Sequence, residues 1–190
     1  MPISPSQTGN GLLMPKLKYR FRVSMYNFGP VGSATTLTQQ VVTAGRPNIQ
    51  HNRTAIHSYN NIMYIPNKPE WQTLEIVVRD DITSGVTKLV GSQLQKQMNH
   101  FDQTSALSGI NFKFLTVIES LDGGNQQVLE SWYLEGCFLE QVQYDSFDYS
   151  SSDPVQITMS LSFDNATQDA QYNVNASARP GETGSGPQIG

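Results

Sequence analysis

The sequence predicts a mainly β protein, a β-sandwich or barrel of about seven strands with one α-helix packed against it. Apolar and polar residues alternate in several separate stretches, which is the period-2 pattern of half-buried strands. One stretch only has the 3 and 4 spacing of an amphipathic helix. The length of 190 residues fits one domain, which we place at residues 17–164 between an N-terminal arm (1–16) and a C-terminal tail (165–190).

The first predicted strand spans residues 17–28, where apolar residues alternate with Lys18, Arg20 and Arg22. One face of this strand would meet the core, and the other would present three cations in a row. A weaker alternation predicts a second strand over 36–44. Residues 1–16, rich in Ser, Pro and Gly, are expected to form a flexible arm.

Residues 45–69 are polar and carry too few apolar side chains for a core of their own. A segment of about 25 residues with this composition is either a loose loop or an arm ordered against a neighbouring subunit. We expect the arm. Its interface residues would be Arg46, Arg53, Tyr59 and Tyr64.

A strand is predicted over residues 71–80 and a helix over 84–102, with cap candidates from Asp81 onward. Four further strands are predicted over 112–119, 127–135, 137–144 and 155–164, the first two joined by a hairpin turn at 121–125. Residues 165–190 lack large apolar side chains and are expected to form a low-complexity tail. The expected core residues are Leu74, Ile76, Leu94, Ile157 and Leu161.

The charge is distributed unevenly along the chain. Residues 1–69 hold seven basic and no acidic residues, for +7, whereas 70–190 hold five basic and sixteen acidic residues, for −11. Halves of opposite sign can attract each other within one subunit or between copies, although the charges can also be scattered over one solvated surface. Only 15% of residues are charged, against about a quarter in ordinary domains, which favours a surface buried in an assembly.

No pattern of catalytic or cofactor-binding residues is present, and we expect neither an enzyme nor a cofactor. Three histidines and Cys137 are too scattered to predict a metal site. Asp145, Asp148 and Asp153 lie in a stretch that could attract calcium, but their spacing favours a turn with local hydrogen bonds. The single cysteine excludes an intrachain disulfide, and no apolar stretch approaches 18 residues, so no membrane insertion is expected.

Several motifs resemble those of the tail tube proteins of contractile-tailed bacteriophages. Residues 132–140 read WYLEGCFLE, residues 142–155 read VQYDSFDYSSSDPV, and a final alternating strand ends at Asp164. Residues 71–81, WQTLEIVVRDD, precede one amphipathic helix, as in the middle of that family. The segment from AGRPN at 44–48 to YIPNKP at 64–69 occupies the place of the family's long inter-subunit loop. The likeness covers residues 17–164.

The resemblance implies a structural virion protein. Six subunits would form a ring whose sheets join into a closed β-barrel, and stacked rings would form a hollow tube through which DNA leaves the capsid. Asp145, Asp148 and Asp153 would lie at a subunit or ring interface. The implied partners are the sheath, tape-measure, baseplate and tail-terminator proteins, with double-stranded DNA passing without tight binding. The implied location is the phage tail, and the host cytoplasm during assembly.

Other functions remain open at this point. A baseplate tube-initiator, or the tube of a related contractile injection system, would have a similar sequence. A β-sandwich binding module for carbohydrate or protein would expose an aromatic platform around Trp71, Trp132 or the residues 144–149. A small hydrolase would need a catalytic constellation that the sequence lacks.

Overall fold

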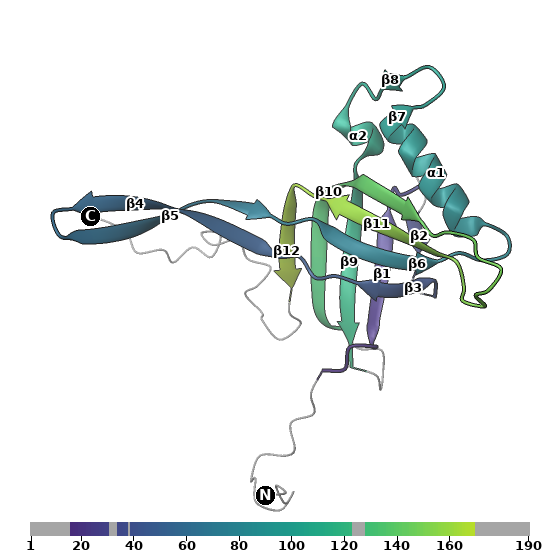
Figure 1. Ribbon diagram of the computed structural model, residues 1–190, viewed down its shortest axis with the longest axis horizontal. Helices are drawn as coiled ribbons and strands as arrows, with labels where there is room; N and C mark the ends of the chain where they lie inside the picture. Colours follow the sequence, from purple (N-terminus) through teal and green to yellow (C-terminus); the bar gives the residue numbers. More distant parts are fainter. Residues whose placement is uncertain (1–15, 31–33, 38, 123–127, 170–190) are drawn as a thin grey trace, which may run out of the picture.

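The computed structural model describes residues 16–30, 34–37, 39–122 and 128–169, and confirms the mainly β fold. An eight-stranded antiparallel sheet has the order β2-β1-β9-β10-β11-β6-β3, and β12 pairs with β10 outside this path (Figure 1). Its strands are β1 (Phe21–Tyr26), β2 (Ala34–Thr36), β3 (Val41–Ala44), β6 (Leu74–Arg79), β9 (Phe114–Leu121), β10 (Val128–Tyr144), β11 (Gln156–Ser162) and β12 (Asn165–Asp169). Outside it lie the hairpin β4 (Ile49–Ser58) and β5 (Asn61–Trp71), the short pair β7 (Met98–Asn99) and β8 (Thr104–Ser105), and the helices α1 (Gly85–Gln97) and α2 (Gly109–Phe112).

The sheet becomes two layers because β10 bends. Its first half pairs with β9 and β12, and its second half pairs with β11. At the bend Gly136 has φ +68°, and a Cβ there would come 2.2 Å from a carboxylate oxygen of Asp164. Only glycine tolerates both the left-handed backbone and this close approach. The strands β11, β6 and β3 therefore cross in front of β1, β9, β10 and β12 (Figure 1).

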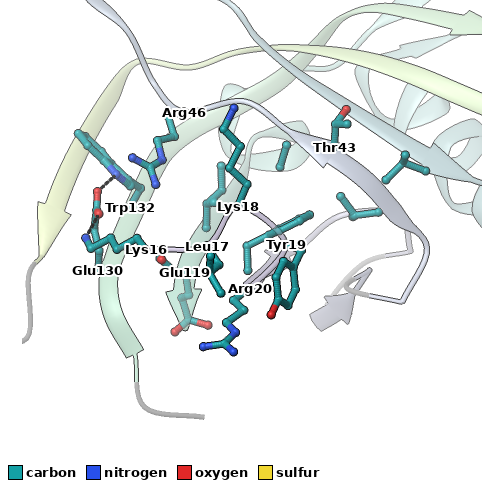
Figure 2. A pocket seen from close by; sticks show the side chains of 16 residues that line it. Lys16, Leu17, Lys18, Tyr19, Arg20, Thr43, Arg46, Glu119, Glu130 and Trp132 are labelled. Atoms are coloured by element: carbon teal, nitrogen blue, oxygen red, sulfur yellow. Dashed lines mark hydrogen bonds and ion pairs between the residues drawn. The ribbon is translucent and has the colours of Figure 1, made fainter. Parts of the chain in front are cut away.

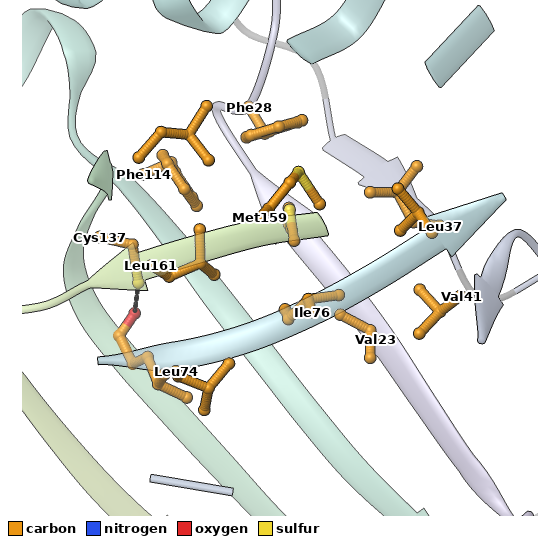
Figure 3. Close-up of a cluster of buried hydrophobic side chains, with 14 of the residues drawn as sticks. Val23, Phe28, Leu37, Val41, Leu74, Ile76, Phe114, Cys137, Met159 and Leu161 are labelled. Atoms are coloured by element: carbon orange, nitrogen blue, oxygen red, sulfur yellow. Dashed lines mark hydrogen bonds between the residues drawn. The ribbon is translucent and has the colours of Figure 1, made fainter. Parts of the chain in front are cut away.

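Apolar side chains from the inner faces of both layers fill the space between them (Figure 3). Alternate residues of each strand point inward, as the period-2 pattern requires. Leu74, Ile76, Ile157 and Leu161 are buried, and Leu94 of α1 is half-buried against the same core. Helix α1 also inserts Val86 and Val90 into this core.

Helix α1 ends at Gln97, five residues before the end expected from the sequence. The Gln97 amide binds the backbone of β10: its Nε2 donates to the Leu139 carbonyl and its Oε1 accepts from the Leu139 N–H, both at 2.9 Å. Met98 is extended and pairs with Ser105, so it leaves the helical path. Phe101, inside the predicted helix range 84–102, therefore lies outside α1 and is 93% exposed.

The predicted strand over 36–44 is two strands in different layers. The Leu37 carbonyl accepts hydrogen bonds from the N–H groups of Gln40 and Val41, which makes a turn between β2 and β3. The first strand begins only at Phe21, because the Arg20 N–H bonds the Leu17 carbonyl in a turn. The predicted strands 127–135 and 137–144 are one continuous strand, β10, bent at Gly136.

The predicted tail begins too early. Residues 165–169 form β12, which pairs with Ser131–Glu135 of β10 and buries Ala166. Backbone pairing along the open side of β10 supplies the stabilisation that the small, polar side chains do not. The rest of the tail, the arm before Lys16 and most of the predicted turn at 121–125 lie outside the described residues.

Candidate assembly surfaces

The segment predicted as an arm is a regular two-stranded hairpin that projects from the body (Figure 1). Its strands pair from Ile49–Trp71 to Ser58–Asn61, and Tyr59 at the tip has φ +50°. Trp71 anchors the base by packing on Phe163, with ring centroids 5.6 Å apart. The sequence did not predict this hairpin, because residues 45–69 are mostly polar and show only fragments of the apolar–polar alternation of a strand.

Both faces of the hairpin expose apolar side chains. Cross-strand partners share a face, so Ile56 and Met63 lie on one face and Ile62 lies with His57 on the other. The large apolar side chains of 49–65 are 44–102% exposed. Such a surface on both sides of a projecting ribbon is typical of an element covered by other chains.

The predicted interface residues of the arm occupy three places. Arg53 lies 4.6 Å from the centre of the Tyr64 ring, close enough for a cation–π contact. Tyr59 is fully exposed at the tip. Arg46 lies before the hairpin, outside its strands, where it lines a groove with residues of the body.

This groove lies between β3 and the ends of β1, β9 and β10 (Figure 2), and we call it the basic groove. Its cations are Lys16, Lys18, Arg20 and Arg46, and its two carboxylates are Glu119 and Glu130. Apolar side chains form the rest of the lining, among them Phe21, Ile118 and Trp132. The groove thus combines cations with an apolar floor.

Glu130 is the best-connected carboxylate of the groove and is only 6% exposed. It accepts hydrogen bonds from Lys16 Nζ at 2.6 Å, Trp132 Nε1 at 2.7 Å and Gln168 Nε2 at 2.9 Å. The bond from Lys16 is the largest cause that lowers the pKa of Glu130, and burial opposes it. Glu130 therefore ties the start of the described chain to β10 and β12.

The other groove carboxylate, Glu119, is bound by Arg22 at 2.5 Å. Arg20 donates to the Asp122 carbonyl. Among the described residues Lys18, Arg20 and Arg46 form no ion pair. No local pattern in the sequence predicts that Lys16 lies beside Glu130 and Trp132, because 114 positions separate the two residues of the ion pair Lys16–Glu130.

Asp145, Asp148 and Asp153 lie together in the connection between β10 and β11, at residues 145–155, which we call the acidic loop. Each carboxylate has a local partner: Asp145 accepts from the Ser146 N–H, Asp148 from Ser150, and Asp153 from Ser151. The Ser150 backbone bond is the main cause that lowers the pKa of Asp148. None of the three pairs with a cation in the described part of the chain.

Two other features of the described residues bear on chemistry. No group of three His, Cys, Asp or Glu side chains among them could hold a metal ion, and none of their helices is long and apolar enough to cross a membrane. Cys137 is buried, which raises the pKa of its thiol to about 11 and keeps it protonated at neutral pH.

No protein-family model matches the sequence, and no curated protein sequence matches it significantly. Solved structures match its fold. A chain of the anti-feeding prophage baseplate has a TM-score of 0.66 at 12% identity, with 84% of this chain and 98% of that chain covered. A chain of the sheath–tube complex of PVC, an extracellular contractile injection system, has a TM-score of 0.56 at 19% identity and covers 89% and 99%. A chain of the SPP1 tail tube has a TM-score of 0.56 at 12% identity and covers 83% and 80%.

The fold is therefore that of components of phage tail tubes and contractile injection systems. This confirms, at the level of fold, the resemblance that the motifs of residues 71–81 and 132–155 indicated.

Proposed function

We propose that this chain is a tail tube protein, whose copies form hexameric rings that stack into the hollow inner tube of a contractile phage tail. The observation that carries the proposal is the projecting hairpin β4–β5. A lone two-stranded hairpin is marginally stable in water, and this one exposes Ile56 and Met63 on one face and Ile62 on the other. It therefore requires neighbours on both faces, which adjacent subunits of a ring and its stacked partner would supply.

The ends of the sheet support ring formation. β2, β3 and β12 each pair with one strand among those described, which leaves sheet edges with unpaired backbone groups. Joining such edges around a ring removes a surface that otherwise invites aggregation. Stacking of rings repeats a head-to-tail contact that does not close, so it grows a tube.

The tube has a structural rather than a catalytic role: it is the conduit through which DNA leaves the capsid. The sheath, tape-measure, baseplate and tail-terminator proteins are its partners, and the tube belongs to the virion after assembly in the host cytoplasm. The fold likeness to chains of sheath–tube and tail-tube structures supports this role.

Electron microscopy of the purified chain tests the proposal. Hollow tubes or six-fold rings are the expected result. A protein that stays monomeric at high concentration, with its hairpin exposed, would argue for a binding module instead.

A baseplate tube-initiator, or the tube of a related injection system, is the second candidate. It is favoured by the fold likeness to chains of the anti-feeding prophage baseplate and of PVC. Abundance in purified particles separates the two roles. A main tube protein gives a dominant band, whereas an initiator present in one or two rings gives a faint one.

A further inference from the structure

The basic groove holds three cations, Lys18, Arg20 and Arg46, that form no ion pair with any residue the structure describes. Lys16 pairs with Glu130 and Arg22 pairs with Glu119, while Arg46 also helps to lower the pKa of Glu130 without forming an ion pair. With Lys18 and Arg20, the groove keeps an excess of three positive charges around its apolar lining. Figure 2 shows the side chains of these three residues around one concave surface. A ligand that fits this groove needs about three negative charges and an apolar surface.

The acidic loop has both properties. Asp145, Asp148 and Asp153 carry three negative charges and form no ion pair among the described residues. Between them Phe147 and Tyr149 are 90% and 112% exposed. Two uncovered aromatic rings amid carboxylates are unusual for a solvated loop, and they are typical of an interface core with a polar rim.

The acidic loop and the groove residues Glu130 and Trp132 lie at opposite ends of β10. The base of the loop lies nearer the β3 wall of the same groove, since the Asp80 N–H donates to the Val155 carbonyl and the Arg79 N–H donates to the Gln40 carbonyl. Groove residues Glu130 and Trp132 lie near the start of β10, and the loop follows the end of that strand. About 13 residues of strand separate them, or roughly 40 Å along the bent strand. In Figure 1 the loop projects at the right-hand edge, whereas the starts of β1 and β10 lie below the centre.

We propose that the acidic loop of one copy docks into the basic groove of the next copy. The inference rests on the proposed tube function, and it names the complementary contact that joins successive subunits. Because the two surfaces differ, the contact is head-to-tail and propagates through an assembly. The carboxylates would meet Lys18, Arg20 and Arg46 while Phe147 and Tyr149 cover the apolar floor.

A second copy of the chain fits the groove better than a nucleic acid does. The apolar lining, which includes Phe21, Ile118 and Trp132, suits the aromatic rings of the loop and not the sugar-phosphate backbone of a duplex. The excess of three positive charges in the groove matches the charge of one loop, whereas a duplex presents a continuous row of phosphates. DNA binding in the groove is therefore the competing outcome of the test.

Charge reversal in two separate variants tests the contact. The loop variant is Asp148→Lys with Asp153→Lys, and the groove variant is Lys18→Glu with Arg46→Glu; all four side chains are exposed. In each variant alone, loop and groove carry the same sign of charge. We expect the critical concentration for assembly to rise at least about tenfold, because like charges at an interface are repulsive. Mixed in equal amounts, the loop of each variant meets the opposite charge in the groove of the other.

The mixture is therefore expected to assemble near the wild-type concentration, with the two variants in equal numbers. A control mixture of Lys88→Glu and Asp102→Lys, which reverses exposed charges outside both surfaces, is expected to assemble both alone and mixed. Thermal unfolding of each variant at low concentration checks that the monomer is folded. Neutral Asp145→Asn, Asp148→Asn and Asp153→Asn substitutions keep acceptors for the local bonds and should flatten the salt dependence of assembly.

The proposal is overturned if folded single variants assemble normally, or if their mixture stays unassembled. It is also overturned if the wild-type groove binds a short DNA duplex and the groove variant loses only that binding. These outcomes are separate from failure of the proposed function, in which the wild-type chain forms neither rings nor tubes.

Discussion

Glu130 is a buried carboxylate whose three donors come from three separate parts of the chain: Lys16, Trp132 and Gln168. Its position near the start of β10 makes it a junction for the first and last described segments. Since its pKa is lowered in the folded chain, the ionised form stabilises the fold. Loss of that charge should loosen both segments together.

The sign of the pH dependence follows from this lowered pKa. Glu130 stabilises the fold fully above its ordinary pKa of 4.5, and the contribution is lost as pH falls through its lower native pKa. Glu130→Gln should cost about 1 kcal/mol at neutral pH and should weaken the loss of stability on acidification below about pH 4.5. Chemical unfolding as a function of pH measures both. Glu140→Gln, at an exposed position on the same strand, is the matched control and should behave as wild type.

Leu161 and Ser160 are neighbours on β11 that point to opposite faces. Leu161 is fully buried in the core, whereas Ser160 is half-buried on the outer face opposite Glu75. Leu161→Ala should lower the free energy of unfolding by about 2–5 kcal/mol, because it leaves a cavity. Ser160→Ala should be nearly neutral. Equal shifts of the two thermal midpoints would contradict the register of β11.

At the scale of elements, the hairpin β4–β5 should be dispensable for folding and essential for assembly. Replacing residues 50–70 by an Asn-Gly turn joins Ile49 to Trp71, which are cross-strand partners, and keeps Trp71 on Phe163. We expect a monomer with a thermal midpoint near that of wild type and no tubes. Sedimentation and electron microscopy measure the loss of assembly.

A deletion of residues 48–62 is a poorer experiment, because it removes β4 and leaves β5 without its partner strand. A matched control is Asn60→Ser at the tip, which changes one exposed side chain outside the predicted interface residues and leaves the hairpin paired; it should assemble as wild type. Normal tubes from the hairpin-less chain would refute its role as an inter-subunit arm.

The sequence predicted those elements whose side chains alternate against one core. β6 and β11 show this clearly, since Leu74, Ile76, Ile157 and Leu161 point inward from regular strands. The sequence did not predict the features that depend on backbone geometry or on backbone pairing. The bend at Gly136 joins two predicted strands, and β12 forms through backbone pairing with hardly any apolar side chain. The sequence did not predict the hairpin β4–β5, because both its faces are exposed and carry apolar as well as polar side chains, so apolar and polar residues do not alternate regularly.

The surfaces were predictable to a similar, partial extent. The acidic loop was visible because its carboxylates are close in sequence, at Asp145, Asp148 and Asp153. The basic groove was hidden because Lys16, Arg46 and Trp132 meet only after β1, β3 and β10 have packed. Spatial clusters of this kind leave no local spacing in a sequence.

At the scale of the whole molecule, some charges of the basic first part of the sequence pair with charges of the acidic remainder within the chain. The ion pairs Lys16–Glu130 and Arg22–Glu119 each join the basic first part of the sequence to the acidic remainder. Basic and acidic residues remain outside these two ion pairs, and they can attract the opposite charges of neighbouring copies. Assembly should therefore weaken in 1 M salt, where the Debye length falls to about 3 Å.

The same charge balance predicts weak contact with DNA. The chain carries −4 overall, Arg22 is held by Glu119, and Lys18 and Arg46 are assigned above to the contact between copies. Few cations are left to form a continuous track for phosphates, and a nonspecific DNA binder normally reaches about 10⁻⁴ to 10⁻⁶ M at physiological salt. We expect assembled tubes to leave short duplexes in the supernatant when sedimented at micromolar concentration. Co-pelleting that disappears on substituting Lys18, Arg20 and Arg22 by Gln would instead place these cations on the path of the DNA. A tube that binds DNA in this way would need a further mechanism to release it.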